Sequence, residues 1–268
     1  MIGILVKAGV VGSMSLFFVV FARDGKYVFE KIRELEKFNV PYVIVCGEHI
    51  NHPKVVFRPP IGKYDAINFS LRLIPKDVNI VALNDVDTKI YNFEAALCHL
   101  KNKRVGLVFA KDVVKSGPQV LFHQLLFSIL RIFPILANGD LMLIRRNILE
   151  KIHLMPCKAE DAYILFKVLQ LGYHAIFCEE CYVETEKSKN EKEEEIYKRR
   201  TVAGIYQALS YTRPPPLIRL FYALLLFLFP LLLISGKKGY FWMKGFLLGY
   251  MDYLRGDRSG VWQTAYMK

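Results

Sequence analysis

The sequence lacks several signals that would each assign a function directly. It has no glycine-rich phosphate-binding loop, no nucleophilic serine elbow and no internal repeat, so P-loop nucleotidases, α/β-hydrolases and repeat proteins are set aside. Its five cysteines are an odd number at irregular spacing, which argues against a disulfide framework and favours a reducing compartment. The apolar residues 1–20 show no small-residue cleavage pattern, so we do not expect a secretory signal.

Acidic residues are also scarce. The chain has 25 Asp and Glu against 37 Lys and Arg, a formal net charge of +12. Hydrophobic residues make up 53% and aromatic residues 13% of the sequence, which excludes disordered and fibrous classes. A chain that is both basic and this apolar fits nucleic acid poorly, and we expect no nucleic-acid partner. It fits an anionic membrane surface or a phosphorylated substrate better.

One long apolar run is present, from Leu217 to Ser235, and its only charge is Arg219. As a helix its nineteen residues would extend roughly 28 Å, close to the ~30 Å of a bilayer's hydrocarbon core. Lysine and arginine flank both ends, so the sequence does not orient the segment. Residues 240–254 are predicted as the return arm of a hairpin or as an interfacial helix. The alternative is a buried core helix in a soluble domain.

Before that run, short apolar strands alternate with amphipathic helices. This order indicates an α/β fold with a mainly parallel central sheet covered on both faces. In such sheets, ligands bind beyond the carboxyl ends of the strands. The expected strands are residues 16–21, 40–46, 54–57, 79–83, 104–110, 138–146 and 173–178, and the expected helices are residues 27–38, 62–73, 92–100 and 162–171.

Two carboxylates follow the fourth of these strands, in the sequence Leu83-Asn-Asp85-Val-Asp87-Thr88. On a strand, residues i and i+2 point to the same side. Two carboxylates that share one direction repel each other unless a cation lies nearby, and a hard divalent ion completed by phosphate oxygens meets that need. A lone Asp-x-Asp is also common in turns, so the motif depends on its surroundings.

A second acidic pair, Glu160-Asp161, precedes a predicted helix that ends at Gly172. Taken alone, the pair has a structural explanation, because acidic residues at a helix start offset the helix dipole and cap free N–H groups. The charged segment 184–195 is predicted as a mobile loop near the site. Cys178-x-x-Cys181 and the loop residues His49 and His52 have no partners that would complete a metal site, and we set them aside.

These motifs together resemble the family 2 glycosyltransferases, which have the GT-A nucleotide-sugar-binding fold. The resemblance covers roughly residues 16–204 and follows the family's order. The matching pieces are Phe21-Ala-Arg-Asp24, Gly62-Lys63-x-x-Ala66-Ile67-Asn68, Asn84-Asp85-Val-Asp87 and Ala159-Glu160-Asp161 with Gly172-Tyr173. Phe21 stands in place of the family's usual proline, and Lys198-Arg199-Arg200-Thr201 has no tryptophan, which puts long-chain processive synthesis in doubt.

The resemblance implies a role for each matching residue. Asp85 contacts the nucleotide ribose, and Asp87, with Asp85, binds a divalent metal, Mg²⁺ or Mn²⁺, on the diphosphate. Lys63 and Asn68 help hold the nucleotide, and Glu48 falls near the family's second-strand aspartate that recognises the base, although Gly47 intervenes. Arg199 or Arg200 approaches the diphosphate or, alternatively, lies on a solvated or lipid-facing surface. Asp161, beside Glu160, is the catalytic base. The residues concerned are Glu48, Lys63, Asn68, Asp85, Asp87, Glu160, Asp161 and Arg200.

We therefore expect three parts: an N-terminal extension (1–14), a GT-A catalytic domain (15–198) and membrane-associated or transmembrane helices that begin with an interfacial helix (199–268). The predicted function is metal-dependent, inverting transfer of a sugar from a nucleotide-diphosphate donor to a lipid-linked or glycan acceptor. The catalytic domain is expected on the cytoplasmic side of the cell membrane. Two rivals stay open: a degenerate transferase that serves as a membrane scaffold, and a nucleotidyltransferase on a related sheet.

Overall fold

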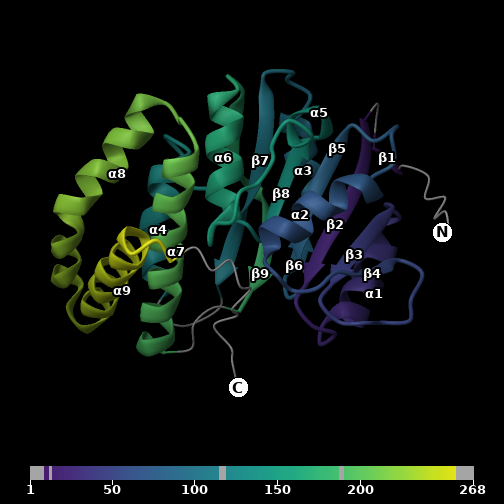
Figure 1. Ribbon diagram of the computed structural model, residues 1–268. Helices are drawn as coiled ribbons and strands as arrows, with labels where there is room; N and C mark the ends of the chain where they lie inside the picture. Colours follow the sequence, from purple (N-terminus) through teal and green to yellow (C-terminus); the bar gives the residue numbers. More distant parts are fainter. Residues whose placement is uncertain (1–8, 12–13, 115–118, 187–189, 258–268) are drawn as a thin grey trace.

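A computed structural model of the chain describes residues 9–11, 14–114, 119–186 and 190–257. Within them, one sheet runs through the molecule with helices on both faces (Figure 1). The strand order is β4-β3-β2-β5-β8-β7-β9-β6, with β1 paired outside this path to β2. The strands are β1 (Gly9–Val11), β2 (Met14–Ala22), β3 (Tyr42–Cys46), β4 (Val55–Phe57), β5 (Ile80–Asp85), β6 (Lys89–Tyr91), β7 (Val105–Val114), β8 (Leu141–Arg145) and β9 (His174–Thr185).

The first half of the sheet is parallel, as the continuous apolar strands predict. β4, β3, β2 and β5 all run in one direction, and β2 and β3 are almost wholly buried. Phe21 of β2 pairs with Asp85 of β5. The carboxyl ends of the two central strands therefore lie side by side, and the Asp-x-Asp motif follows one of them.

The second half of the sheet is mixed. β8 runs antiparallel to both β5 and β7, and β6 antiparallel to β9, while β7 and β9 are parallel. The sequence predicts a mainly parallel sheet, and the parallel strands lie chiefly in its N-terminal half, with β7 and β9 a further parallel pair. The reversal has a structural consequence, because the start of β8 meets the end of β5: Asn84 pairs with Leu141. Residues that precede β8 therefore reach the same edge as Asp85.

Alternate residues of β2 enter two separate cores. Phe17, Val19 and Phe21 lie in one core, with α2 (Lys63–Ser70), the 3-10 turn η1 (Leu71–Leu73), α5 (Arg146–Leu149) and α6 (Glu160–Gln170). Their even-numbered neighbours lie in the other core, which α1 (Val28–Phe38) and α3 (Phe93–His99) cover. This alternation is the period of two that a strand buried on both faces requires.

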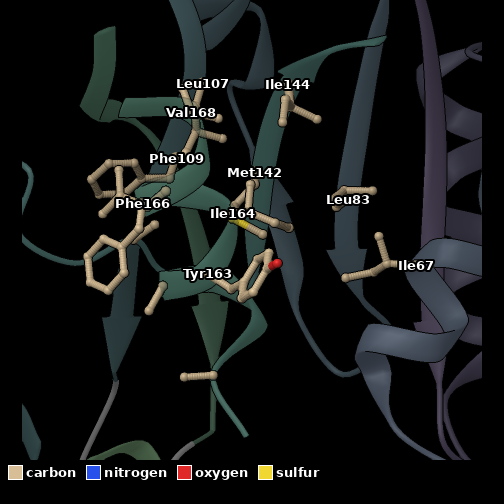
Figure 2. Close-up of a cluster of buried hydrophobic side chains, with 14 of the residues drawn as sticks. Ile67, Leu83, Leu107, Phe109, Met142, Ile144, Tyr163, Ile164, Phe166 and Val168 are labelled. Carbon is tan, nitrogen blue, oxygen red and sulfur yellow. The ribbon is translucent and has the colours of Figure 1, made fainter. Parts of the chain in front are cut away.

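Helix α6 is fixed against the sheet by its apolar face. Figure 2 shows Ile164, Phe166 and Val168 of α6 facing the β7 and β8 side chains of the first core. All three are fully buried. The helix begins at Glu160, so this packing determines where Glu160 and Asp161 lie.

The prediction of a loop at residues 184–195 is wrong for those of them that the structure describes. β9 continues to Thr185, and α7 (Glu191–Tyr211) begins only six residues later. Asn190 caps α7, because its side-chain oxygen accepts hydrogen bonds from the N–H groups of Lys192 and Glu193. The acidic residues of the first turn then favour the helix through its dipole.

Four further elements had no counterpart in the sequence prediction. They are β1, which pairs with β2, the short helix α5, the helix α4 (Gln119–Leu130) that follows β7, and the short strand β6, which pairs with β9. α4 packs against β7, the strand that precedes it.

The C-terminal part is a helical hairpin. α8 (Pro216–Leu228) and the 3-10 segment η2 (Phe229–Ser235) run outward, and α9 (Gly236–Leu254) returns along α7 (Figure 1). The stretch Pro216–Leu254 is long and apolar enough to cross a membrane by length and composition.

Helices α7 and α9 approach each other closely because glycines face the contact. A Cβ atom on Gly245 would lie 2.7 Å from the carbonyl oxygen of Glu195, and one on Gly249 would overlap the carbonyl oxygen of Arg199. The Arg199 guanidinium also donates two hydrogen bonds to Asp252, at 2.6 and 2.8 Å. α9 is thus held to α7 along its length.

Candidate functional site

A cavity of about 1960 Å³ opens at the carboxyl ends of β2 and β5. Six of the eight residues that the sequence analysis singled out line it: Lys63, Asp85, Asp87, Glu160, Asp161 and Arg200. They come from β5 and the turn after it and from α2, α6 and α7. The acids at positions 85, 87 and 161, far apart in the sequence, therefore lie around one cavity.

The turn that carries Asp87 is built by short polar side chains. The hydroxyl of Thr88 donates to the carbonyl oxygen of Asp85 at 2.8 Å. The fully buried amide of Asn84 donates to that hydroxyl at 2.8 Å and to the carbonyl oxygen of Asp140 at 2.6 Å. These bonds join the end of β5 to the residue before β8. They leave Asp85 half-buried and Asp87 exposed at the cavity.

Lys31 supports the same turn from the other face of the sheet. It is 2% exposed, donates to the carbonyl oxygen of Thr88 and lies 2.7 Å from Glu34. Glu34 in turn accepts the N–H of Ile90 at 2.6 Å. Burial lowers the pKa of Lys31, an effect that Glu34 opposes.

Lys63 lies at the centre of the acidic cluster. Its Nζ is 2.7 Å from Asp85 and 3.3 Å from Glu160, and it donates to the carbonyl oxygen of Gly139 at 3.1 Å. Burial disfavours the charged form of this amine, but Asp85 and then Glu160 outweigh that effect and raise the pKa of Lys63. The ammonium group is therefore a fixed positive charge among the carboxylates.

Two carboxylates of the cluster have raised pKa values. Burial, with Asp140 and Asp87 nearby, raises the pKa of Asp85 to about 7, although Lys63 opposes the shift. Burial and the neighbouring Glu160 raise the pKa of Asp161 to about 6, against Lys63, the Ala162 N–H and Arg200. Perturbed carboxyl groups in a cavity are typical of functional sites.

Asp161 faces the cavity from the first turn of α6. Its Oδ1 accepts the N–H of Ala162 at 2.7 Å, which orients the carboxylate. A Cβ atom on Gly139 would lie 3.2 Å from Asp161 Oδ2 and 3.4 Å from Lys63 Nζ. The absence of a side chain at Gly139 thus lets the lysine and the carboxylate share a small space.

Two expected contact residues do not line the cavity. Asn68 uses its amide to hold the backbone of Leu154, as donor at 2.9 Å and as acceptor at 3.1 Å, so its side chain is engaged within the fold. Glu48 is exposed and accepts the N–H of Gly25 at 2.9 Å. Glu48 follows β3, and through this bond it contacts the turn after β2, whose Asp24 does line the cavity.

The sequence analysis missed Lys31 and Asp140. Lys31 could have been found, because it lies among the apolar positions of α1, where Val28, Ile32 and Leu35 are buried. Asp140 precedes β8, which the sequence analysis did not recognise as antiparallel to β5. Only the antiparallel direction brings Asp140 to Asp85, whose N–H donates to the carbonyl oxygen of Asp140 at 3.2 Å.

A separate group, on β9 and at the end of α3, has the residue types of a metal site. The ligand atoms of His99, Cys178 and Glu180 lie within 4.8 Å of one another. Burial raises the pKa of Cys178 to about 11, and its thiol donates to Glu180 at 3.6 Å. None of these three residues lines the main cavity, so the group does not alter its assignment.

No protein-family profile matches the sequence, and no curated protein sequence matches it significantly. Solved structures do match. The first is described as mannosyltransferase PcManGT from Pyrobaculum calidifontis in complex with GDP-Man and Mn²⁺, with a TM-score of 0.64 and 16% identity, covering 89% of this chain and 86% of that one.

Two more structures are similar. GalNAc-T7 with UDP, GalNAc and Mn²⁺ has a TM-score of 0.53 and 11% identity, covering 75% of this chain and 48% of the other. S. aureus TarS has a TM-score of 0.52 and 16% identity, covering 70% and 39%. The match thus spans less than half the length of these two proteins. At such identities the likeness shows the fold, which is that of the GT-A-type glycosyltransferases.

Proposed function

We propose that the chain is a metal-dependent glycosyltransferase that uses a nucleotide-diphosphate sugar. The observation that carries the proposal is the meeting of Asp85, Asp87 and Asp161 at one cavity within a GT-A-type fold. A fold alone does not determine an activity. Here the acidic residues lie where that fold presents its strand ends, and their pKa values are perturbed.

The donor side of the cavity suits a divalent cation. Asp85, Asp87 and Asp140 offer only oxygen ligands, and Asp140 and Asp87 lie close enough to Asp85 to raise its pKa. Such a set fits Mg²⁺ or Mn²⁺. We assign Asp87, with Asp85, as the protein ligands. When bound, the metal would neutralise charge on the departing diphosphate.

Other residues of the chain hold the rest of the donor. Lys63 fixes the orientation of Asp85, which we assign to the nucleotide ribose. Arg200 lies close enough to Asp161 to lower its pKa, and we assign its guanidinium to the diphosphate oxygens, which it can bind with two parallel hydrogen bonds.

Asp161 is proposed as the base of an inverting displacement. The acceptor oxygen attacks the anomeric carbon, and a new C–O bond forms on the face opposite the diphosphate. The bond between that carbon and the β-phosphate oxygen breaks, and its electron pair leaves with the nucleoside diphosphate. The acceptor's proton passes to Asp161. The raised pKa of Asp161 makes its carboxylate a stronger base than an ordinary aspartate.

We further propose that the reaction takes place at a membrane, with the catalytic domain on the cytoplasmic side, and that the acceptor is lipid-linked or a membrane-associated glycan. The apolar stretch Pro216–Leu254 and the net charge of +12 support this location.

Asp87→Ala tests the donor site. The variant should lose Mn²⁺-dependent binding of GDP and UDP by at least about 100-fold, measured by calorimetry with and without metal. Asp77→Ala, in the turn before β5 and outside the cavity lining, is the matched control and should bind as wild type. Wild-type protein that binds no nucleotide with metal, and hydrolyses no member of a nucleotide-sugar panel, would refute the proposal and favour the scaffold alternative.

A further inference from the structure

The cavity continues from the acidic cluster into an apolar region, which we call the apolar arm. Ile135, Leu136, Tyr222, Leu225, Leu232 and Trp242 line it. The same cavity therefore has a charged end at the strand termini and an apolar end among α8, η2, α9 and the segment after α4.

The walls of the apolar arm are held together by specific contacts. The Tyr222 hydroxyl donates to the carbonyl oxygen of Ile135 at 2.9 Å, and the Tyr206 hydroxyl donates to the carbonyl oxygen of Tyr222 at 2.8 Å. Phe229 and Phe246 stack at 4.9 Å. The arm is thus a built space between packed helices, since each wall is fixed to its neighbour.

Helix α8 has one face toward the apolar arm and another toward the outside. Tyr222 and Leu225 line the cavity, whereas Leu224 and Leu228 are 48% and 51% exposed. Leu231 of η2 continues this exposed surface at 58%. The helix therefore separates the apolar arm from an apolar outer surface.

We propose that the acceptor is an amphiphile whose apolar chain occupies the apolar arm while its polar group lies at Asp161. A soluble glycan would leave this apolar end of the cavity filled with water, which is unfavourable. A hydrocarbon chain buries its own apolar surface there. The assignment to the acceptor rests on the proposed function, but the binding of an apolar chain does not.

Tryptophan fluorescence tests chain binding directly. The chain has two tryptophans, so the Trp262→Phe variant reports on Trp242 alone. In amphipol, 10-bromodecanol should quench Trp242 saturably, while 4-bromobutanol should quench it only weakly. Affinity should rise roughly 3- to 4-fold per methylene over the length that the apolar arm covers.

Two neighbouring leucines provide the matched variants. Leu225→Glu places a carboxylate in the apolar arm and should abolish saturable quenching, whereas Leu224→Glu alters the outer face and should leave it unchanged. Leu232→Glu, from a different element, replaces Leu225→Glu if that variant does not fold, as judged by its circular dichroism and nucleotide binding. Equal quenching by both alcohols, or equal loss in the inward and outward variants, would overturn the inference.

A transfer assay links the apolar arm to the acceptor. With a donor that the enzyme hydrolyses, decyl β-glucoside should release nucleoside diphosphate with a KM at least 100-fold below that of butyl β-glucoside. Equal KM values would overturn the acceptor assignment while leaving glycosyl transfer intact. Protein that binds 10-bromodecanol but neither binds nor hydrolyses any donor would instead show that the proposed function is wrong.

Discussion

Lys63 explains how so many carboxylates can lie close together in a cavity. Its ammonium group contacts Asp85 and Glu160 and lowers the pKa of Asp161. Without that charge, the acids would repel one another and take up protons at neutral pH. The lysine is itself held by the carbonyl oxygen of Gly139, so its position does not depend on a substrate.

The role of Asp161 predicts a pH profile. Its pKa is raised to about 6, and only the carboxylate form accepts a proton. Activity should therefore fall as pH drops through about 6, rather than through the value near 4 of an ordinary aspartate. The initial rate of nucleoside diphosphate release, measured from pH 4.5 to 8 at saturating donor, checks this.

Asp161→Asn separates catalysis from binding. It should reduce kcat by about 10²- to 10⁴-fold and leave donor affinity nearly unchanged, as measured by calorimetry. Substantial surviving activity would indicate that the acceptor is already ionised, as a phosphate is, and that Asp161 only positions it.

Asn68 is predicted to act on stability rather than on nucleotide binding. Asn68→Ala removes both bonds to the Leu154 backbone, and we expect a loss of about 1–3 kcal/mol in the free energy of unfolding. Asn68→Asp keeps an acceptor for the Leu154 N–H and should lose less. A large fall in nucleotide affinity with an unchanged Tm would instead restore the role implied by the sequence resemblance.

Among the contacts between elements, that of α7 with α9 requires particular residues, because glycines of α9 lie against the α7 backbone. An exposed helical glycine is usually improved by alanine, by about 1 kcal/mol. At Gly249 the sign should reverse, because the added methyl would overlap the carbonyl oxygen of Arg199 and approach Val202. We expect Gly249→Ala to destabilise the protein by about 1–3 kcal/mol.

Thermal unfolding by circular dichroism measures this effect. Leu247→Ala, at an exposed position of the same helix, is the control and should leave Tm nearly unchanged. A Gly249→Ala variant as stable as wild type would mean that α9 does not pack against α7 in solution.

The elements also show what the sequence could and could not predict. The buried strands and their carboxyl ends were predictable because apolar runs followed by acids mark them, and Asp85 and Asp87 were found in this way. The direction of β8 was not predictable, because a short apolar strand has the same hydrophobic pattern whether it runs parallel or antiparallel to its neighbours. For that reason Asp140 was missed. The start of α7 was misread as a loop, since its first turns are charged and owe their helical form to the Asn190 cap.

Contacts between side chains and distant segments could not be predicted from the sequence either. Asn68 occupies the position of a family motif, yet its amide meets Leu154, 86 residues away. Lys31 reaches the turn after β5 from the opposite face of the sheet. Neither contact follows from local periodicity, because both depend on how distant segments pack.

The molecule as a whole has an apolar end and a strongly basic composition. Phe227 is 79% exposed on the C-terminal hairpin, at the opposite end of the sheet from α1 in Figure 1. The protein should therefore bind vesicles, more strongly when they contain anionic lipid than when they are neutral.

Phe227→Glu should weaken vesicle binding clearly in a flotation assay, because it puts a charge on the apolar surface. Phe29→Glu is the control, since Phe29 is also exposed, at 58%, but lies on α1. Equal behaviour of the two variants would show that the hairpin is not the surface that meets the membrane.

The contact between α7 and the residues just before α6 limits how the C-terminal helices can be exchanged or lost in evolution. Gly204 lies directly against the Lys158–Ala159 backbone, and Gln207 accepts the N–H of Lys158 at 3.0 Å. Trimming the chain back to the sheet and its covering helices would remove this support and disturb the acids that follow. The C-terminal helices from α7 onward therefore cannot be exchanged like an independent module, because α7 supports the start of α6.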